Sequence, residues 1–188
     1  MGRVFVHMSV SVDGFFEGPR ADISWHLVDA EVHGYVNDVL RPVATYLVGR
    51  RSYELMQAYW PTAALEPDVP PEIRDFAEQW RSTPKVVASR TLASVADGDS
   101  LVREVDADVV RSLATRGDVS VGGADLAGPL LALGVVDEVL LYVHPVLIGA
   151  GRALFPPGVR ADLRLLDSHR FGNGVVHLRY AVGDVSTG

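Results

Sequence analysis

The sequence predicts an α/β protein built on a mostly parallel sheet, and two observations lead to this fold class. Segments with the alternation of a strand are followed, through most of the chain, by segments with helical spacing. This order of elements is typical of parallel strands covered by helices. The last part of the chain indicates two strands joined across Gly172-Asn-Gly174, a hairpin signal. Such a hairpin would add an antiparallel edge to the sheet.

The first strand has the clearest pattern, because Val4, Val6, Met8 and Val10 alternate along residues 3–10. A loop rich in Gly, Pro and Asp follows. Further strands are expected at 45–48, 85–88, 119–121 and 137–146, with the hairpin at 163–182. Helices are expected at 28–40, 50–59, 72–80, 106–116 and 125–133. Loops or turns are expected at 13–23, 61–71 and 97–100, and both chain ends, 1–2 and 184–188, are expected to fray.

Composition excludes several classes of protein. The 188 residues suit one compact domain spanning 1–188. The formal net charge of −7 disfavours nucleic-acid binding, because phosphate recognition needs a basic surface. No segment is apolar and long enough to cross a membrane, and the N-terminus lacks a signal-peptide pattern. The absence of cysteine removes disulfides and thiolate catalysis, and is compatible with the cytoplasmic location that we expect.

One strand-to-helix turn stands out as a candidate anion site. Residues 119–121 form a strand, Gly122 and Gly123 follow, and a helix with Leu126 and Leu130 on one face comes next. The first amides of a helix have no partner inside it, and the helix dipole favours negative charge there. Glycine lets the backbone approach a phosphate closely. The same pattern also fits a tight connection in which the glycines serve only geometry. Neither a Rossmann glycine motif nor a P-loop is present here.

Two further turns place cations and hydroxyls after strands. Gly49-Arg-Arg-Ser52 follows the strand at 45–48, and Ser89-Arg-Thr91 follows the strand at 85–88. Ligands of open α/β sheets bind at the carboxyl ends of the strands. Arginine suits phosphate through its planar fork of donors, and an adenosine 2′-phosphate would favour NADPH over NADH. Taken singly, each of these arginines fits a surface role better, either solvated or paired to a surface carboxylate. Three such turns at strand ends in one chain nevertheless favour a site.

Taken together, these segments resemble the dihydrofolate-reductase-like superfamily, and within it the reductase domain of bacterial riboflavin biosynthesis and its stand-alone relatives. The resemblance covers about residues 3–155 and is carried, in family order, by 9–14, 48–54, 87–91, 121–126, 136–140 and 144–145. It implies a three-layer α-β-α fold with a mostly parallel central sheet, NADPH as cofactor, a homodimer, and hydride transfer to a pteridine- or pyrimidine-like heterocycle, as in 5-amino-6-(5-phosphoribosylamino)uracil reductases.

The resemblance also implies site residues. It matches a cofactor-phosphate turn to Gly49, Arg50, Arg51 and Ser52. It matches a strand end that binds the adenosine phosphate to Ser89, Arg90 and Thr91. It matches a pyrophosphate site to Gly122, Gly123, Ala124, Asp125 and Leu126. It matches the loop near nicotinamide and substrate to Ser11, Asp13 and Gly14, and His144 lies at a strand end inside a family motif.

A flat acceptor calls for aromatic walls. Tyr53, Met56 and Trp60 have the spacing of one helix face, while Phe15, Phe16 and Trp25 fall in the loop after the first strand. We therefore predict substrate contacts from Ser11, Phe15, Trp25, Tyr53, Trp60 and His144, although each aromatic also suits a core position.

The proton donor is the least determined residue. Dihydrofolate reductases carry a carboxylate on the first helix, and here Asp29, Glu31 and Asp38 align with it only ambiguously. Asp13 is our candidate, and it would need a raised pKa to act as an acid near neutrality. Dihydrofolate itself is therefore not the expected substrate. No pair of histidines has metal-binding spacing, so we expect no metal.

Two other functions fit the same residues. One is an NADPH- or nucleotide-binding protein with little or no turnover, which the ambiguous acid favours. The other is a flavin- or antifolate-binding protein with incidental reductase activity. Binding of NADPH, followed by a panel of acceptors, separates these hypotheses.

Overall fold

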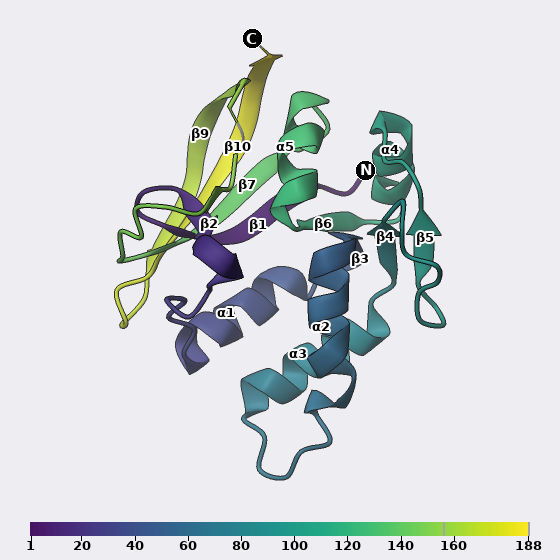
Figure 1. The fold of residues 1–188 in the computed structure, drawn as a ribbon, viewed down its shortest axis with the longest axis vertical. Coiled ribbons are helices and arrows are strands. Elements are labelled where there is room, and N and C mark those ends of the chain that lie inside the picture. Colours follow the sequence, from purple (N-terminus) through teal and green to yellow (C-terminus); the bar gives the residue numbers. More distant parts are fainter. Residues whose placement is uncertain (156, 188) are drawn as a thin grey trace.

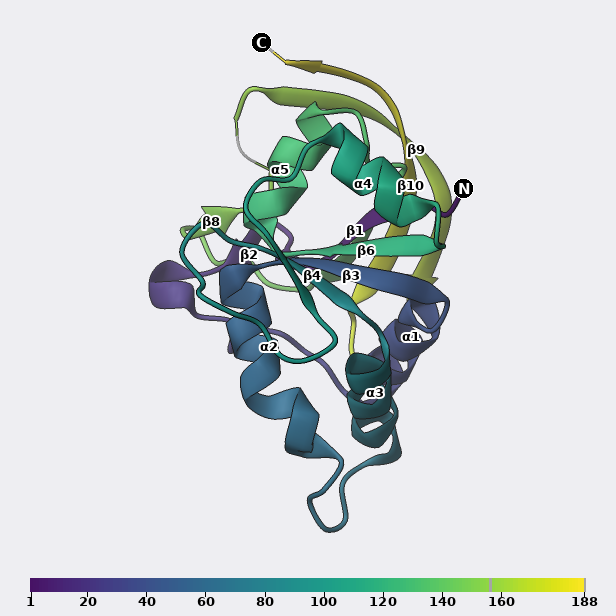
Figure 2. The ribbon, with the colours of Figure 1, turned by 90° about the vertical axis from the view of Figure 1, so that its right-hand side faces the viewer.

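The computed structural model describes residues 1–155 and 157–187 and shows one eight-stranded sheet between two helical layers (Figure 1). The strand order is β5-β4-β3-β6-β1-β7-β10-β9. The first six strands in this order are parallel, and β10 runs antiparallel to both β7 and β9. Helices α4 and α5 cover one face, and α1, α2 and α3 cover the other (Figures 1 and 2). The predicted fold class, a mostly parallel sheet with an antiparallel C-terminal hairpin, is confirmed.

The elements follow the expected order, with some added. The strands are β1 (Val4–Ser11), β2 (Phe15–Glu17), β3 (Val43–Gly49), β4 (Lys85–Ala88), β5 (Ser100–Val102), β6 (Asp118–Gly122), β7 (Glu138–His144), β8 (Arg152–Ala153), β9 (Val159–Arg170) and β10 (Val176–Thr187). The helices are the 3-10 turn η1 (Pro19–Ala21), α1 (Ala30–Leu40), α2 (Arg50–Ala63), α3 (Pro71–Ser82), α4 (Ala107–Ala114) and α5 (Ala124–Ala132).

The alternation along β1 divides the core in two. Val4, Val6 and Val10 belong to the apolar cluster formed with α4 and α5. Phe5 points the other way, into the cluster formed with α1, α2 and α3. Because successive side chains of a strand point to opposite faces, both halves of the core are built from one central strand. The predicted half-buried strand is therefore covered on both faces.

Several boundaries differ from the sequence-based expectation. Helix α2 continues through Pro61 to Ala63, which is fully buried, so packing outweighs the hydrogen bond that proline removes. The strands β2, β5 and β8 were not predicted, because segments of two or three residues carry no periodicity. Strands β9 and β10 are longer than expected: β9 begins at Val159, and β10 runs to Thr187 through residues predicted to fray. Because β9 and β10 pair as far as Val159 and Thr187, the residues predicted to fray form part of a strand.

The parallel arrangement brings the three predicted turns to one edge of the sheet. Strand β3 pairs with β4 through Gly49↔Ala88 and with β6 through Val48↔Gly122. The turns that follow these strands therefore lie side by side, with α2 and α5 beginning next to each other. This geometry builds the candidate site.

Candidate functional site

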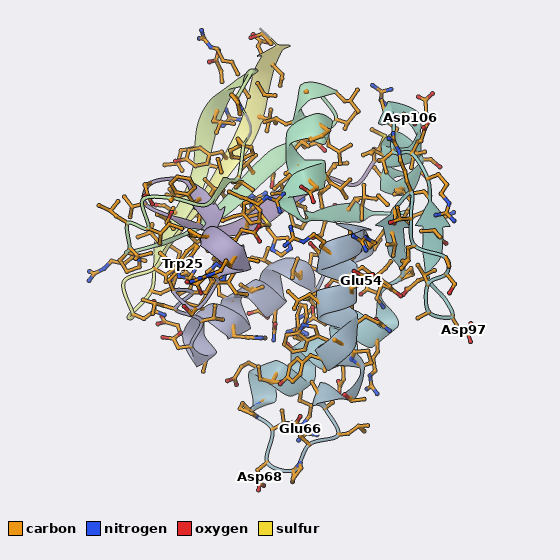
Figure 3. All side chains as sticks on the ribbon, in the orientation of Figure 1. Trp25, Glu54, Glu66, Asp68, Asp97 and Asp106 are labelled. Carbon is orange, nitrogen blue, oxygen red and sulfur yellow. The ribbon has the colours of Figure 1, made fainter. Side chains whose placement is uncertain are left out.

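A cleft of about 700 Å³ opens at this edge of the sheet. The beginnings of α2 and α5 form one side, and β1, β2, the segment that follows β2, and β8 supply the rest. The lining residues are Met8, Phe16, Glu17, Ala21, Ile23, His26, Gly49, Arg51, Ser52, Glu54, Leu55, Gly123, Ala124, Asp125 and Arg152. Figure 3 places Glu54 on α2 and Trp25 on the segment that leads to α1. Two of the predicted turns thus meet at one cavity.

Both helices that begin at the cleft lack a side-chain cap. The N-caps of α2 and α5 are Gly49 and Gly123, neither of which can accept a hydrogen bond through a side chain. By contrast, α1 and α4 are capped by Asp29 and Asp106, whose carboxylates accept from backbone amides. In α5, the amides of Leu126 and Ala127 both donate to the Gly123 carbonyl. The preceding amides come before the first intrahelical hydrogen bond and carry the positive end of the helix dipole.

Gly123 has a structural requirement of its own. Its φ of 99° lies in the region that side chains rarely adopt, and an added Cβ would lie 2.7 Å from Oγ of Ser52. Gly49 differs, because its φ is −76° and the nearest atom to an added Cβ is 4.0 Å away. The close approach of α2 to the start of α5 therefore depends on glycine at 123 and not at 49.

A chain of four charged side chains crosses the cleft. Arg152 Nη1 lies 3.0 Å from Oε1 of Glu17, and its Nη2 pairs with the carboxylate of Asp125. Arg51 Nη1 lies 3.8 Å from the same Glu17 oxygen. Glu17 is buried, whereas Arg51 and Asp125 are more than half exposed. Partner carboxylates raise the pKa of Arg152 against the opposing effect of its burial, so this residue stays charged.

The other predicted cofactor residues are not among the residues that line the cleft. Arg50 is exposed and 3.7 Å from Glu54. The Ser89 hydroxyl accepts hydrogen bonds from the amides of Thr91 and Leu92, so it shapes its own turn. The Arg90 side chain is 81% exposed, with Glu104 at 3.8 Å. Thr91 is exposed, while Gly122 and Leu126 flank the lining residues of the α5 turn.

The aromatic wall expected from α2 is not in the cleft. Tyr53 is buried against the sheet, and its hydroxyl donates to Asp99 and accepts from the amide of Ala96. Trp60 packs on Phe76 at a ring distance of 4.4 Å. The helical spacing was correct, but the face it defines is the inner one. Arg51, Ser52, Glu54 and Leu55 project from α2 into the cleft instead.

Asp13 has an environment opposite to that of a general acid. Its carboxylate accepts hydrogen bonds from the amides of Ile148 and Gly149, at 3.3 and 2.8 Å. The Ser11 hydroxyl and these amides hold its pKa below the usual value. The side chain is exposed and outside the cleft lining. Asp13 therefore links the loop after β1 to the loop that contains Ile148 and Gly149.

His144 and Trp25 hold the segment of residues 18–29, which forms part of the cleft wall. Fully buried His144 accepts a hydrogen bond from the Leu27 amide through Nδ1, at 2.9 Å. The ring of His26, which lines the cleft, stacks on His144, and Trp25 packs edge-on to both. Burial, together with neighbouring His26, lowers the pKa of His144 to about 4. His144 is thus a neutral anchor for this wall.

Ser11 and Phe15 support the wall in a similar way. Buried Ser11 Oγ accepts from the Phe15 amide at 3.1 Å, and Phe15 pairs with Ala153 between β2 and β8. Phe16, the neighbour of Phe15, contacts the cleft in its place. The sequence interpretation missed Glu17 and Arg152, which are distant in the chain. Their only signal was the glycine-rich run from Gly149 to Gly151 directly before Arg152.

Known proteins share this fold and these segments. Residues 3–177 match the RibD C-terminal domain family. The chain belongs to this family. An uncharacterized protein, YyaP of Bacillus subtilis (strain 168), is 30% identical over 182 residues, which cover 95% of this chain and 94% of that protein. The suspected family resemblance is therefore confirmed, and the family is reductase-like.

Solved structures agree with the family assignment. A putative riboflavin biosynthesis protein from Shewanella sp. PV-4 superposes with a TM-score of 0.72 at 19% identity, covering 97% of this chain and 99% of that one. Dihydrofolate reductase from Enterococcus faecalis, solved with NADP(H), has a TM-score of 0.61 at 14% identity, with coverages of 97% and 98%. The RibD-family chain thus has the dihydrofolate-reductase-like fold.

The described residues lack two kinds of feature. Within residues 1–155 and 157–187, no group of three or more His, Asp or Glu side chains is arranged to hold a metal ion. No helix in the described part of the chain has the length and apolar character needed to span a bilayer.

Proposed function

We propose that this protein is an NADPH-dependent reductase of a flat, pteridine- or pyrimidine-like heterocycle. The observation that carries the proposal is the pair of uncapped helix beginnings, α2 and α5, that open side by side into the cleft. Such ends bind the phosphates of nucleotides. Membership of a reductase-like family supports hydride transfer as the reaction.

The residues present fit a dinucleotide phosphate group. Gly123 lets the chain turn into α5 with the amides of Ala124 and Asp125 next to the cleft, where they would donate to the pyrophosphate. Gly49 leaves space at the start of α2, and Arg51 adds a cation at the rim. When bound, the nicotinamide supplies the hydride. The protein positions the acceptor against it and excludes water, a task for apolar lining residues such as Met8, Phe16 and Leu55.

Single arginine variants test the cofactor role. Arg51→Ala should weaken both NADPH and NADH, since Arg51 lines the cleft. Arg90 lies outside the lining. If its side chain contacts the 2′-phosphate, Arg90→Ala should weaken the binding of NADPH and leave the binding of NADH unchanged. Arg50→Ala tests the same role for Arg50. A lost charge-assisted hydrogen bond corresponds to roughly a tenfold to hundredfold weaker affinity. Calorimetric titration with each dinucleotide measures these effects.

Arg111→Ala is the matched control, because this arginine lies on α4 and is exposed. It should leave both affinities unchanged. If NADPH fails to bind the unaltered protein at millimolar concentration, the proposed reductase function is wrong. Equal effects of Arg90→Ala on both dinucleotides would remove only the 2′-phosphate role.

A binding protein with little or no turnover is the second candidate. It is favoured by the environment of Asp13, which stabilises the ionised carboxylate and so disfavours a proton donor. The two functions differ in one measurement. Binding of NADPH without its oxidation by any pterin, aminopyrimidine or quinone would favour the second.

We also propose that the protein forms a homodimer through β9, the outermost strand of the sheet. Leu163, Leu165 and Leu166 are between 38% and 52% exposed on this strand. An open strand edge with apolar side chains is a template for pairing. Antiparallel pairing with a second copy, about a two-fold axis at Leu163 perpendicular to the sheet, places Leu163 opposite its own copy and Arg164 opposite Asp162. The pair of Arg164 and Asp162 then occurs twice.

Charge reversal on β9 tests this interface. Arg164→Asp would place like charges opposite each other, and we expect it to shift the protein from dimer to the 20.3 kDa monomer in sedimentation. Adding Asp162→Arg should restore the dimer, because the pair is re-formed with opposite orientation. Leu147→Asp, in an exposed loop, is the control and should remain dimeric. A monomeric unaltered protein, or a dimer insensitive to Arg164→Asp, would contradict the interface.

A further inference from the structure

The charged residues of the cleft are balanced against one another. Among the described lining residues, three are acidic (Glu17, Glu54 and Asp125) and two are basic (Arg51 and Arg152), which leaves the lining at a formal charge of −1. An anionic acceptor that enters beside the proposed cofactor therefore meets side chains with a net negative charge, unless a cation is released from its partners. Whether Arg51 or Arg152 can leave its carboxylate partner decides whether such an anion can bind.

Arg152 is held on three sides. One nitrogen lies 3.0 Å from Glu17, another pairs with Asp125, and the guanidinium carbon lies 5.0 Å from the centre of the Phe16 ring. Charge-assisted hydrogen bonds are roughly twice as strong as neutral ones, and the ring face favours the cation. Releasing Arg152 toward a ligand anion would leave buried Glu17 without its closest partner.

Arg51 lies on the cofactor side of the cleft. It stands in the first turn of α2, where the proposed cofactor phosphates would lie, and its nearest carboxylate is the same Glu17. Glu17 thus faces both cations of the cleft and is itself only 8% exposed. Once the cofactor has taken the amides of α5 and the Arg51 side chain, no cation among the described lining residues is left for the acceptor.

Apart from His26 and Ser52, the remaining lining is apolar. Met8, Phe16 and Ala21 contribute to it, and Ile23 and Leu55 stand at its rim with 45% and 64% of their surfaces exposed. Large apolar side chains that border a cavity and face solvent are typical of a ligand-binding surface. They offer contact to an apolar ring or substituent, and none to a sugar phosphate.

We propose that the acceptor reduced in this cleft is an uncharged, flat ring system that carries no phosphate or carboxylate within it. Glu17 is the specificity-determining residue, because it holds Arg152 in an ion pair and repels an anionic acceptor. The inference rests on the proposed reductase function and narrows it. The phosphoribosyl acceptor of the reductases that the sequence resembles would be excluded by this charge arrangement.

Riboflavin and FMN are suitable probes, since they share one flat ring system and differ by a phosphate. Binding is followed by flavin fluorescence anisotropy with NADP⁺ present, so the readout is independent of turnover. We expect riboflavin to bind the unaltered protein about tenfold or more tightly than FMN. The isosteric Glu17→Gln variant should strengthen FMN binding by about tenfold, and added salt should weaken that gain. Riboflavin binding should change little.

Glu66→Gln is the matched control, since Glu66 is exposed in the loop between α2 and α3 and does not line the cleft. It should leave the preference for riboflavin unchanged. Equal binding of the two flavins, a preference for FMN, or binding of neither would overturn the inference. A Glu17→Gln variant with unaltered FMN affinity would overturn the role of Glu17. Absence of NADPH binding, by contrast, would defeat the proposed reductase function and leave the flavin preference as a separate result.

Discussion

Gly123→Ala is expected to lower both the stability of the protein and its affinity for NADPH. At a φ of 99°, alanine is strained, and its Cβ would lie 2.7 Å from the Ser52 hydroxyl. Strain of this kind costs about 1–3 kcal/mol, which corresponds to a fall in melting temperature of roughly 2–12 °C for a chain of this size. Relief of the strain would displace the first amides of α5, so we expect NADPH affinity to fall by about tenfold or more.

Gly49→Ala provides the matched control for Gly123→Ala. Both glycines precede a helix at the cleft, but Gly49 has a φ of −76°, and an added Cβ there has 4.0 Å of clearance. Its melting temperature should stay close to that of the unaltered protein, as measured by calorimetry. Unchanged stability and unchanged NADPH binding in Gly123→Ala would show that the turn before α5 is neither strained nor part of the cofactor site.

Acid is expected to destabilise the protein strongly between pH 6.5 and about 4. His144 and His177 are fully buried, and burial is the main cause that lowers the pKa of each to about 4. In the unfolded chain both titrate near 6.5, so in this window the unfolded state binds more protons than the folded state. The free energy of unfolding therefore falls as the pH falls, by about 3 kcal/mol per histidine at the lower end.

Asparagine substitutions test the acid effect, because they keep a hydrogen-bond acceptor and remove the titration. His144→Asn retains an acceptor for the Leu27 amide, and His177→Asn retains a partner for the Tyr35 hydroxyl. In urea unfolding at pH 7.5, 6, 5 and 4.5, each variant should lose less stability on acidification than the unaltered protein. His169→Asn, on exposed strand β9, is the control. Equal pH dependence in all four proteins would show that these buried rings do not govern acid stability.

Local patterns were sufficient to predict most of the framework. The alternation along β1, the helix expected at 106–116 and the hairpin at Gly172-Asn-Gly174 depend on neighbouring residues, and all three are present. The turns after β3, β4 and β6 were placed at one edge for a similar reason, because parallel strands align their carboxyl ends. Strand β5 was missed, since three residues after a turn do not establish a period.

The sequence predicted two glycine turns that lie at the candidate cleft, but it did not show which side chains line the rest of the cleft. Helical spacing grouped Tyr53, Met56 and Trp60 correctly, but the spacing does not reveal which face of a helix meets the sheet and which meets a cavity. Asp13 was selected for its residue type, and its hydrogen bonds to the amides of Ile148 and Gly149 come from a loop about 135 positions away.

The sequence by itself determined the order of strands and helices, the glycine turns and the family. Each of these depends on residues close together in the chain, whose spacing and chemistry can be read directly. Only the tertiary structure decided that Glu17 faces both Arg51 and Arg152, and that β9 presents its leucines at an open edge. These features depend on strand order and on the pairing of β2 with β8. Contacts between distant segments are set by packing, and no local period encodes them.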